Sequence, residues 1–371
     1  MNRTRILNLI VLGILCSFSA AAQGVTVFEE NSEGYTGFRI PAVVKAADGS
    51  ILAFAEGRKN GLGDAGDIDL VMKRSLDGGQ TWGKLEVVWD DGTNTCGNPV
   101  PIVLGKDGKI IMLLTWNLGK DREGDIESYR SIDTRRVFIT GSDDNGYTWS
   151  SPEEITGSVK RPEWGWYATG PCHGIVKTRA PHKGRIIVPS NHTELDSEGH
   201  PASHSQIIYS DDNGNSWKLG AVSEVKGNEG TVAELSNGAL LLNMRHAAEA
   251  DSVRLYAISP DGGESFSEQG RVADLIEPRC QGSILNIPTR SGKASKSLLF
   301  SNPRSMRREK MTIMRSDDNG KTWKEFRKIY EYNSAYSDIV VLSGKTVGIL
   351  YENGDAENTH KRISFDTIDI R

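Results

Sequence analysis

Three aspartates stand close together in residues 63–70, which read GDAGDIDL. Asp64 lies in a glycine-rich stretch, whereas Asp67 and Asp69 alternate into an apolar run that is typical of a β-strand. A carboxylic acid can protonate a leaving group and afterwards activate a water molecule. A loop suits a residue that must reach a substrate atom. We therefore predict that Asp64 is a general acid, with Asp67 as the alternative.

Arg39 is a cation in an apolar stretch, because the residues from Ile40 to Val44 continue as a strand-like run. A buried cation needs an anionic partner. A guanidinium stays charged and matches the geometry of a carboxylate. With 44 Lys and Arg against 49 Asp and Glu, the net charge of −5 provides no positive field over the whole chain. An anionic substrate would therefore need a local arginine cluster, and nucleic acid is not an expected partner.

The elements that would position these residues are indicated by a turn motif that occurs five times. The copy at residues 316–323 reads SDDNGKTW, and the others begin at Ser75, Ser142, Ser210 and Ser259. Asp and Asn side chains can bond backbone N–H groups two residues on, and glycine accepts positive φ. The aromatic residue that ends the motif can start a strand and pack beside the turn. Each copy therefore predicts the turn of a β-hairpin.

The spacing of the motif predicts the architecture. Successive copies begin 67, 68, 49 and 57 residues apart, with strand-like runs and no convincing amphipathic helix longer than two turns between them. Repeats of this length, built from four antiparallel strands, are typical of a β-propeller of 4–8 blades. Six blades in residues 23–371 would take about 58 residues each. We predict an all-β chain whose residues 23–371 form one six-bladed propeller, rather than a β-sandwich.

Residues 1–22 have the pattern of a secretory signal: two arginines, a mostly apolar run and three consecutive alanines. The apolar run is shorter than the roughly 20 residues that span a bilayer. We therefore expect removal of this segment, export to the periplasm or the medium, and no transmembrane segment.

The cysteines and histidines do not indicate a metal or a disulfide framework. Cys16 lies in the signal segment, which leaves Cys96, Cys172 and Cys280 without a Cys-x-x-Cys spacing. Buried free thiols are the expected state of these three. No histidine pair has a metal-like spacing, so we expect neither a metal nor a cofactor.

The repeated turn resembles the Asp box of sialidases, across nearly all of residues 23–371. Five short motifs resemble catalytic segments of that family, in the family's order: Phe38-Arg39-Ile40-Pro41, Asn228-Glu229-Gly230, Leu241-Leu242-Asn243-Met244-Arg245, Ser301-Asn302-Pro303-Arg304 and Tyr336-Ser337-Asp338. Because the Asp box also occurs in non-catalytic propellers, the prediction of an enzyme depends on these motifs. The resemblance also favours Asp64 as the acid.

The resemblance implies a role for each motif. Arg39, Arg245 and Arg304 would bind the carboxylate of sialic acid, and Glu352 would pair with the first of them. Tyr336 would be the nucleophile, since sialidases use tyrosine where other retaining glycosidases use a carboxylate. Glu229 would take the proton of the phenol, with Glu234 as the alternative. Tyr330 and Tyr332 are expected only to pack nearby.

Further positions resemble the family's substrate contacts. Arg58 would bind the 4-hydroxyl, Asn98 would face the N-acetyl group, and Gln281 is a further candidate contact, although Asn98 and Gln281 are equally suited to structural hydrogen bonds. Cys172 stands where the resemblance suggests a glycine. The aromatic residues Trp116, Trp164, Trp166 and Tyr167 are left unassigned between the substrate pocket and the barrel mouth.

The resemblance implies a retaining exo-α-sialidase, expected to be a monomer, that releases sialic acids from glycoproteins, gangliosides and sialyl-oligosaccharides. Two other functions are compatible with the same fold. A trans-sialidase, including the intramolecular kind, would carry the same catalytic residues with a different aglycone site. A non-catalytic glycan-binding propeller need not keep the tyrosine, both acids and three arginines together. The linkage preference is left open.

Overall fold

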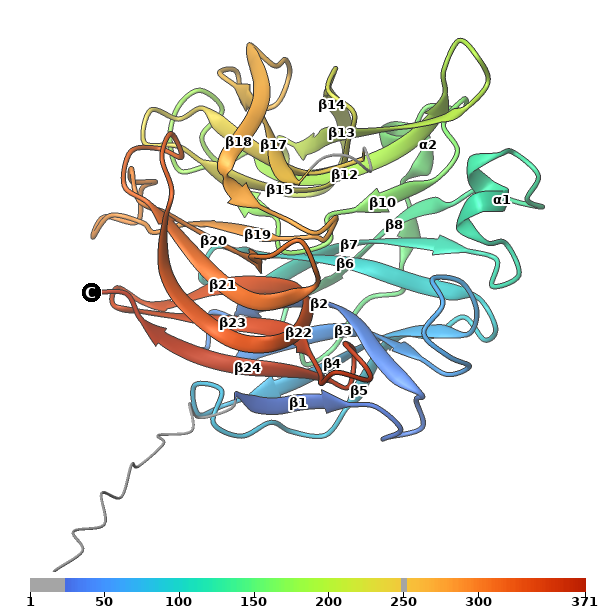
Figure 1. Cartoon of the computed structure of the whole chain (residues 1–371), viewed down its shortest axis with the longest axis horizontal. Coiled ribbons are helices and arrows are strands. Elements are labelled where there is room, and N and C mark those ends of the chain that lie inside the picture. Colours follow the sequence, from blue (N-terminus) through green and yellow to red (C-terminus); the bar gives the residue numbers. More distant parts are fainter. Residues whose placement is uncertain (1–23, 248–251) are drawn as a thin grey trace, which may run out of the picture.

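The computed structural model describes residues 24–247 and 252–371, so the predicted signal segment and Cys16 lie outside the described residues. The chain is all-β, as predicted, with two short helices, α1 (Glu123–Glu127) and α2 (Thr156–Val159) (Figure 1). In the described ranges, neither helix is long and apolar enough to cross a membrane.

The strands form four hydrogen-bonded sheets. The first sheet contains β2 (Gly37–Lys45), β3 (Ile51–Arg58), β4 (Ile68–Ser75), β5 (Glu86–Trp89), β6 (Thr95–Leu104), β7 (Lys109–Asn117), β8 (Arg136–Ser142) and β9 (Glu153–Glu154). The second contains β10 (Tyr167–Thr169), β11 (Ile175–Val176), β12 (Ile186–Leu195), β13 (Pro201–Ser210) and β14 (Lys218–Val222). The third contains β15 (Gly227–Glu234), β16 (Leu240–His246), β17 (Val253–Ser259) and β18 (Glu268–Ile276).

The fourth sheet joins the two ends of the described chain. It contains β19 (Ser283–Asn286), β20 (Leu298–Pro303), β21 (Glu309–Ser316), β22 (Lys324–Ser343), β23 (Thr346–Asn353), β24 (Arg362–Asp369) and β1 (Val25–Glu29). The first half of β22 pairs with β21 and its second half with β23. Because β1 pairs with β24, the first strand of the chain completes the sheet begun by the last ones.

The five motif copies form the same turn, after β4, β8, β13, β17 and β21. In the second copy, Asp144 Oδ1 accepts hydrogen bonds from Ser142 Oγ and from the N–H of Thr148, while Ser142 Oγ accepts one from the N–H of Gly146. The aspartate thus binds the residue four positions on, and not two as predicted, because the carboxylate spans the whole turn. The Thr148 hydroxyl also donates to Asp144 Oδ2 at 2.6 Å. This bond, followed by the others, lowers the pKa of Asp144 to about 2.

The turns lie at the opposite ends of their strands from the residues predicted to do chemistry. In the first sheet, Ser75 at the end of β4 pairs with Ile51 at the start of β3, whereas Arg58 at the end of β3 pairs with Ile68. The repeated motif is therefore structural, and the functional side chains lie at the opposite ends of the strands.

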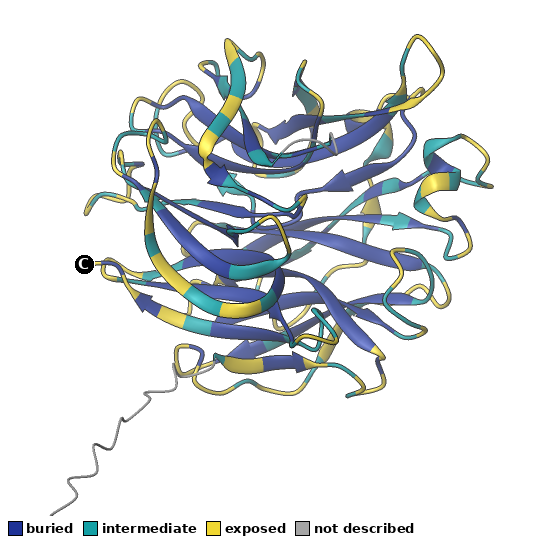
Figure 2. Ribbon diagram, in the orientation of Figure 1, coloured by how far each residue is buried: buried dark blue, intermediate teal, exposed yellow. Residues whose placement is uncertain are grey.

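The core consists of apolar clusters both within and between the sheets, and the central strands are buried whereas the outer loops are exposed (Figure 2). Phe28, Phe38 and Phe365 join β1, β2 and β24 in one of several apolar clusters. Aromatic and aliphatic side chains of this kind supply most of the stabilisation of a β fold.

The three described cysteines are buried free thiols, as predicted. Cys172 has φ of 137°, in a region that favours glycine. The glycine suggested at this position by the resemblance therefore corresponds to a real backbone requirement. The thiol occupies the space by packing 3.4 Å from Thr231 Oγ1.

Candidate active site

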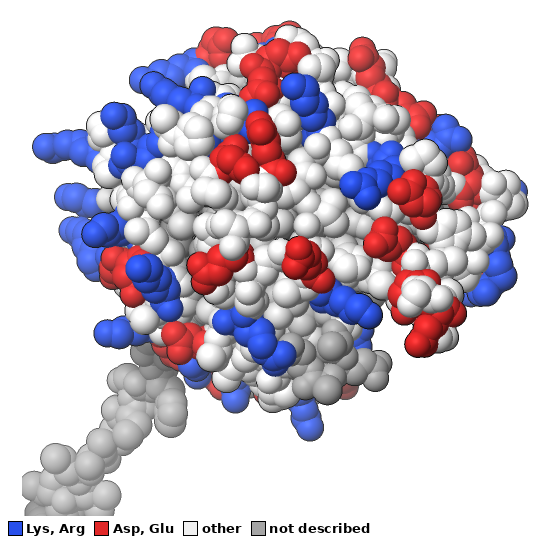
Figure 3. All heavy atoms as spheres, turned by 90° about the horizontal axis from the view of Figure 1, so that it is seen from above, with Lys and Arg blue, Asp and Glu red and all other residues white. Residues whose placement is uncertain are grey.

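A cavity of about 490 Å³ gathers side chains from all four sheets. Its lining includes Arg39, Arg58, Asp64, Asn98, Glu229, Arg245, Arg308 and Tyr336. On the face drawn in Figure 3, acidic and basic side chains are intermixed, with Lys and Arg more frequent along one edge. Inside the cavity, an anionic ligand would meet the positive charge of the arginines that line it.

Tyr336 and Glu229 form the centre of the cavity. The Tyr336 hydroxyl donates a hydrogen bond of 2.6 Å to Glu229 Oε1, and both side chains are buried. Burial, followed by the negative charge of Glu229, raises the pKa of Tyr336 well above its ordinary value. The phenol is therefore neutral at rest, and Glu229 is the group within reach of its proton.

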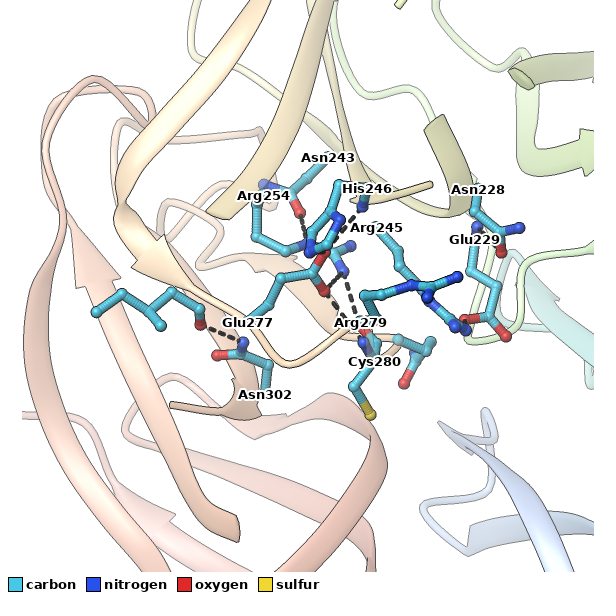
Figure 4. Close-up of polar contacts among 12 residues, drawn as sticks. Asn228, Glu229, Asn243, Arg245, His246, Arg254, Glu277, Arg279, Cys280 and Asn302 are labelled. Atoms are coloured by element: carbon cyan, nitrogen blue, oxygen red, sulfur yellow. Dashed lines mark hydrogen bonds and ion pairs between the residues drawn. The ribbon is translucent and has the colours of Figure 1, made fainter. Parts of the chain in front are cut away.

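Arg245, at the end of β16, faces both of these residues. Its Nη1 lies 2.7 Å from Glu229 Oε2 and 3.2 Å from the Tyr336 hydroxyl oxygen. Figure 4 shows the side chains of Arg245 and Glu229 pointing toward each other. Glu277 holds the strand that carries Arg245, because its carboxylate accepts a hydrogen bond from the N–H of His246. The same carboxylate forms a buried ion pair with Arg254 at 2.9 Å.

Arg39 is the second arginine of the cluster. Its Nε donates to Glu352 Oε1 at 2.8 Å, which brings together two residues 313 positions apart. The Arg39 guanidinium lies 5.1 Å from the centre of the Tyr336 ring. Burial alone would lower the pKa of Arg39, but the charge of Glu352, its hydrogen bond with Arg39 and the other nearby acidic groups together raise the pKa. The guanidinium thus stays charged inside the cavity.

The third arginine is Arg308, and the prediction of Arg304 is wrong. Arg304 stands outside the cavity, about one-third exposed, with Nη1 3.3 Å from Glu325. Arg308 lines the cavity instead, with its guanidinium 5.6 Å from the Tyr336 ring centre. Both arginines belong to the hairpin between β20 and β21. The backbone N–H of Arg304 donates to the carbonyl oxygen of Lys310, so Arg304 lies at the base of the loop, whereas Arg308 lies nearer its tip. The loop contains three arginines, and spacing alone could not identify the inward one.

Asp64 lies at the mouth of the cavity, with its side chain more than half exposed and Oδ1 2.8 Å from Arg58 Nη2. Arg58 is buried, and Glu56 Oε2 lies 2.6 Å from the same nitrogen. Asp67, the second candidate for the acid, forms an ion pair with Lys59 at 3.0 Å and does not line the cavity.

The second candidate for the base, Glu234, also lies outside the cavity, as do the two tyrosines near Tyr336. Glu234 binds Lys177 at 3.1 Å and the backbone N–H groups of Thr178 and Arg179. The Tyr330 hydroxyl donates to the carbonyl oxygen of Gly354, and Tyr332 is exposed. Among the candidates for nucleophile and base, only Tyr336 and Glu229 contact each other in the cavity.

Asn98 and Gln281 have different positions. Asn98 lines the cavity on the side of Arg58. Gln281 is fully buried beneath it: its Nε2 donates to the carbonyl oxygens of Pro171 and Ser337, and its Oε1 accepts from the N–H of Ser337. Because these bonds occupy both polar atoms of Gln281, the prediction that it contacts the substrate is wrong. Gln281 instead holds the backbone of Ser337, the residue after Tyr336.

Several further lining residues carry no recognisable signal in the sequence. Glu123 and Glu127 reach the cavity from α1, and burial together with Glu127 raises the pKa of Glu123 to about 7. Of the unassigned aromatic residues, only Trp166 lines the cavity. Arg135 lies beside it, with its guanidinium 3.9 Å from the ring centre. In the described ranges, no group of three or more His, Cys, Asp or Glu is arranged to hold a metal.

The chain is similar to known proteins over most of its length. Residues 49–349 match the family described as BNR repeat-like domain. The chain is 30% identical over 361 residues to an exo-alpha-sialidase of Aspergillus fumigatus, covering 89% of this chain and 83% of the relative. The chain belongs to the sialidase family.

Two further relatives extend the comparison within the sialidases. The chain is 33% identical over 339 residues to a sialidase of Micromonospora viridifaciens, covering 87% of this chain and 50% of the relative. It therefore spans about half the length of that sialidase. The solved structure of Hadza microbial sialidase Hz136 superposes with a TM-score of 0.81 at 29% identity, covering 94% of this chain and 68% of that one.

Glu352 is expected to stabilise this member of the sialidase family above about pH 4. Its carboxylate is fully buried and accepts hydrogen bonds from Arg39 Nε and from the N–H groups of Ile40 and Tyr336. Burial alone would raise its pKa, but Arg39 and then His360 hold it well below the ordinary value. The folded state thus binds its proton more weakly than the unfolded chain does, so this stabilisation is present above about pH 4.3 and is lost as the pH falls further.

A Glu352→Gln variant should unfold more easily at pH 7, by about 3–5 kcal/mol, because a buried guanidinium loses its counter-charge. Urea unfolding at pH 7 and at pH 3.5 measures the difference. The gap between the variant and the wild type should narrow at the lower pH. A gap of equal size at both values would show that Glu352 is not the titrating group.

Proposed function

We propose that this chain is a retaining exo-α-sialidase that removes terminal sialic acids from glycoproteins, gangliosides and sialyl-oligosaccharides. The observation that carries the proposal is the 2.6 Å hydrogen bond between Tyr336 and Glu229 inside a cavity whose arginines include Arg39, Arg245 and Arg308. A non-catalytic glycan-binding protein would have no need for a nucleophile and its base in contact beneath that cluster.

The carboxylate of sialic acid sits on the carbon that reacts, which explains the arginines and the tyrosine together. Arg39, Arg245 and Arg308 bind that carboxylate by charge-assisted hydrogen bonds. An anionic nucleophile would be repelled by it, whereas Tyr336 approaches as a neutral phenol. Glu229 takes the phenol proton as the Tyr336 oxygen bonds to the anomeric carbon and the glycosidic bond breaks.

Asp64 supplies a proton to the leaving oxygen. Burial by itself would raise the pKa of Asp64, but Arg58 and then Arg39 hold it below the ordinary value in the free protein. A substrate carboxylate bound to Arg39 offsets that positive charge and excludes water, and both effects favour the protonated acid. The same group, once deprotonated, activates the water that hydrolyses the tyrosyl intermediate, so the anomeric configuration is retained.

We further propose that the four sheets are arranged as six blades of a propeller. Contacts between the innermost strands support a closed ring, running from β2 to β6, to β10 and β11, to β15, to β19, to β22 and back to β2. Each of these begins a run of about four antiparallel strands, and the run without an Asp box is the one that β1 completes. In a closed ring, the strand ends that carry the functional residues would all lie around one opening.

Export to the periplasm or the medium is likewise proposed, on the composition of residues 1–22 alone. Action outside the cytoplasm would suit the proposed substrates, which are surface and secreted glycans. A monomer suffices for the chemistry, since every residue assigned to it comes from one chain.

The function is tested by incubating the protein with sialyllactose and following the products by proton NMR. We expect free sialic acid, with the α-anomer formed first. Excess isotope-labelled lactose separates hydrolysis from transfer, because transfer would place the sialyl group on the labelled acceptor, and an anhydro sugar would indicate the intramolecular reaction. A first-formed β-anomer would overturn the retaining mechanism, and no release from any α2,3-, α2,6- or α2,8-linked substrate would overturn the proposed function.

A further inference from the structure

Four nitrogen atoms lie within hydrogen-bond distance of the Glu352 carboxylate. Its Oε1 accepts hydrogen bonds from Arg39 Nε at 2.8 Å and from the N–H of Ile40 at 2.9 Å. Its Oε2 accepts one from the N–H of Tyr336 at 3.2 Å, and Nδ1 of the His360 ring lies 3.1 Å from the same oxygen. The carboxylate therefore links the first arginine of the cavity and the backbone of the proposed nucleophile to a histidine.

His360 lies outside the cavity, in the loop between β23 and β24. The loop is tied to the residue after β1, because Asn358 Nδ2 donates to Glu30 Oε2 at 2.6 Å. Asn358 Oδ1 accepts a hydrogen bond from the N–H of His360 at 2.9 Å. The start of the loop is fixed as well, since the N–H of Gly354 donates to the carbonyl oxygen of Asn333 at 3.0 Å. The loop therefore holds the imidazole ring beside the buried carboxylate.

The charge of Glu352 decides what the histidine does there. Burial alone would raise the pKa of Glu352, but Arg39 and then His360 hold it well below the ordinary value, so the carboxylate is ionised. An ionised carboxylate only accepts hydrogen bonds, so the ring nitrogen that faces it must carry a hydrogen. Within the described ranges, His360 Nδ1 has no other hydrogen-bond partner. The contact has the length of a hydrogen bond without its full alignment, and the soft χ2 torsion of histidine allows the ring to turn into line.

Arg39 depends on Glu352 for its direction. It binds Glu352 through Nε, and in the described part of the chain neither of its terminal nitrogens donates to a protein group. The fork of Arg39 can therefore meet a carboxylate in the cavity, provided that Glu352 keeps its orientation. Tyr336 depends on Glu352 less, because its hydroxyl is bound by Glu229 and the N–H of the next residue by Gln281.

We propose that His360 is a positioning residue: it donates a hydrogen bond to Glu352 Oε2 and so fixes the orientation in which Glu352 holds Arg39 toward the substrate carboxylate. The inference rests on the proposed function, which assigns Arg39 to that carboxylate. His360 does not line the cavity, so it acts on the substrate only through Glu352 and Arg39. Its loss should therefore weaken substrate binding more than the chemical step.

Leucine and asparagine side chains have the same branched shape, so two variants at position 360 separate the donor from the bulk of the ring. His360→Leu removes the donor and should raise KM for a 4-methylumbelliferyl α-sialoside by about 5–10-fold, with kcat within about twofold of the wild type. His360→Asn keeps an N–H group near the place of Nδ1 and should bring KM back to within about twofold. Affinity for free sialic acid, measured by calorimetry, should follow the same order.

A double variant tests the route through Arg39. On an Arg39→Met background, His360→Leu should cause no further change in KM, because the group that it positions is absent. A further fivefold rise in KM on that background would show that His360 acts by another route, and would overturn the inference.

The other outcomes are distinguishable. The inference is overturned if His360→Asn loses as much affinity as His360→Leu, or if His360→Leu leaves KM unchanged. An equal fall of kcat in both variants at constant KM would indicate a purely structural role and would also overturn it. Should His360→Leu not fold, His360→Met takes its place in the comparison. A wild type that binds sialic acid but cleaves no sialoside contradicts the proposed function alone, and calorimetry still tests His360; a wild type that does neither contradicts both.

Discussion

A Tyr336→Phe variant should lose about 10³-fold or more in kcat on any α-sialoside, the scale seen when a catalytic nucleophile is removed. The change deletes only the oxygen that would bond to the anomeric carbon. The ring should still pack against Ile40, Cys280 and Ala335, so the fold and the arginine cluster should persist. KM should change little, because the carboxylate of the substrate is bound by the arginines. Initial rates with a fluorogenic sialoside measure both constants.

Tyr330→Phe is the matched control. It removes the hydroxyl of a nearby tyrosine that binds the carbonyl oxygen of Gly354, outside the cavity. Its kcat should stay within about twofold of the wild type, in line with substitutions away from the chemistry. Undiminished turnover by Tyr336→Phe would show that this tyrosine is not the nucleophile.

An Arg308→Met variant should raise KM for sialosides and lower kcat/KM by about 10–100-fold, whereas Arg304→Met should stay within about twofold. A charge-assisted hydrogen bond to a carboxylate contributes about 1.5–3 kcal/mol, and Arg308 faces the cavity whereas Arg304 pairs with Glu325 on the surface. The two residues share one hairpin, so each variant serves as the control for the other.

Affinity for free sialic acid, measured by calorimetry, should fall in parallel for Arg308→Met. An intermediate loss for Arg308→Lys would agree with a point charge replacing a bidentate fork. A larger loss for Arg304→Met than for Arg308→Met would contradict the assignment of Arg308 and favour Arg304 as the third arginine.

These arginines illustrate what could and could not be predicted from the sequence. The contact of Arg39 with Glu352 followed from chemistry and the family motif, because a cation in an apolar strand requires an anion even 313 residues away. The Asp-box hairpins followed from local turn chemistry. The prediction of Arg304 failed because its motif leads from the end of a strand into a loop that contains two more arginines. Only the folded hairpin decides which of the three points inward.

The remaining residues depend on packing between sheets. Gln281 reads as a polar contact in the sequence, yet it is buried with both polar atoms used by backbone groups. Arg135 precedes β8 and becomes part of the site only because Asn98 on β6 and Trp166 lie beside it. The side-chain and backbone hydrogen bonds of Asn98 join residues from 17 to 71 positions apart, and no local pattern encodes them.

The proposed mechanism depends on a covalent bond between the Tyr336 oxygen and the anomeric carbon of sialic acid. The most direct measurement is to trap it with 2,3-difluorosialic acid, in which fluoride leaves carbon 2 while the fluorine on carbon 3 slows hydrolysis by destabilising a positively charged transition state. Intact mass followed by peptide mapping should find one sialyl group, on the peptide that contains Tyr336, and none in Tyr336→Phe. An adduct on Glu229 or Asp64, or irreversible inhibition of Tyr336→Phe, would contradict the proposed mechanism.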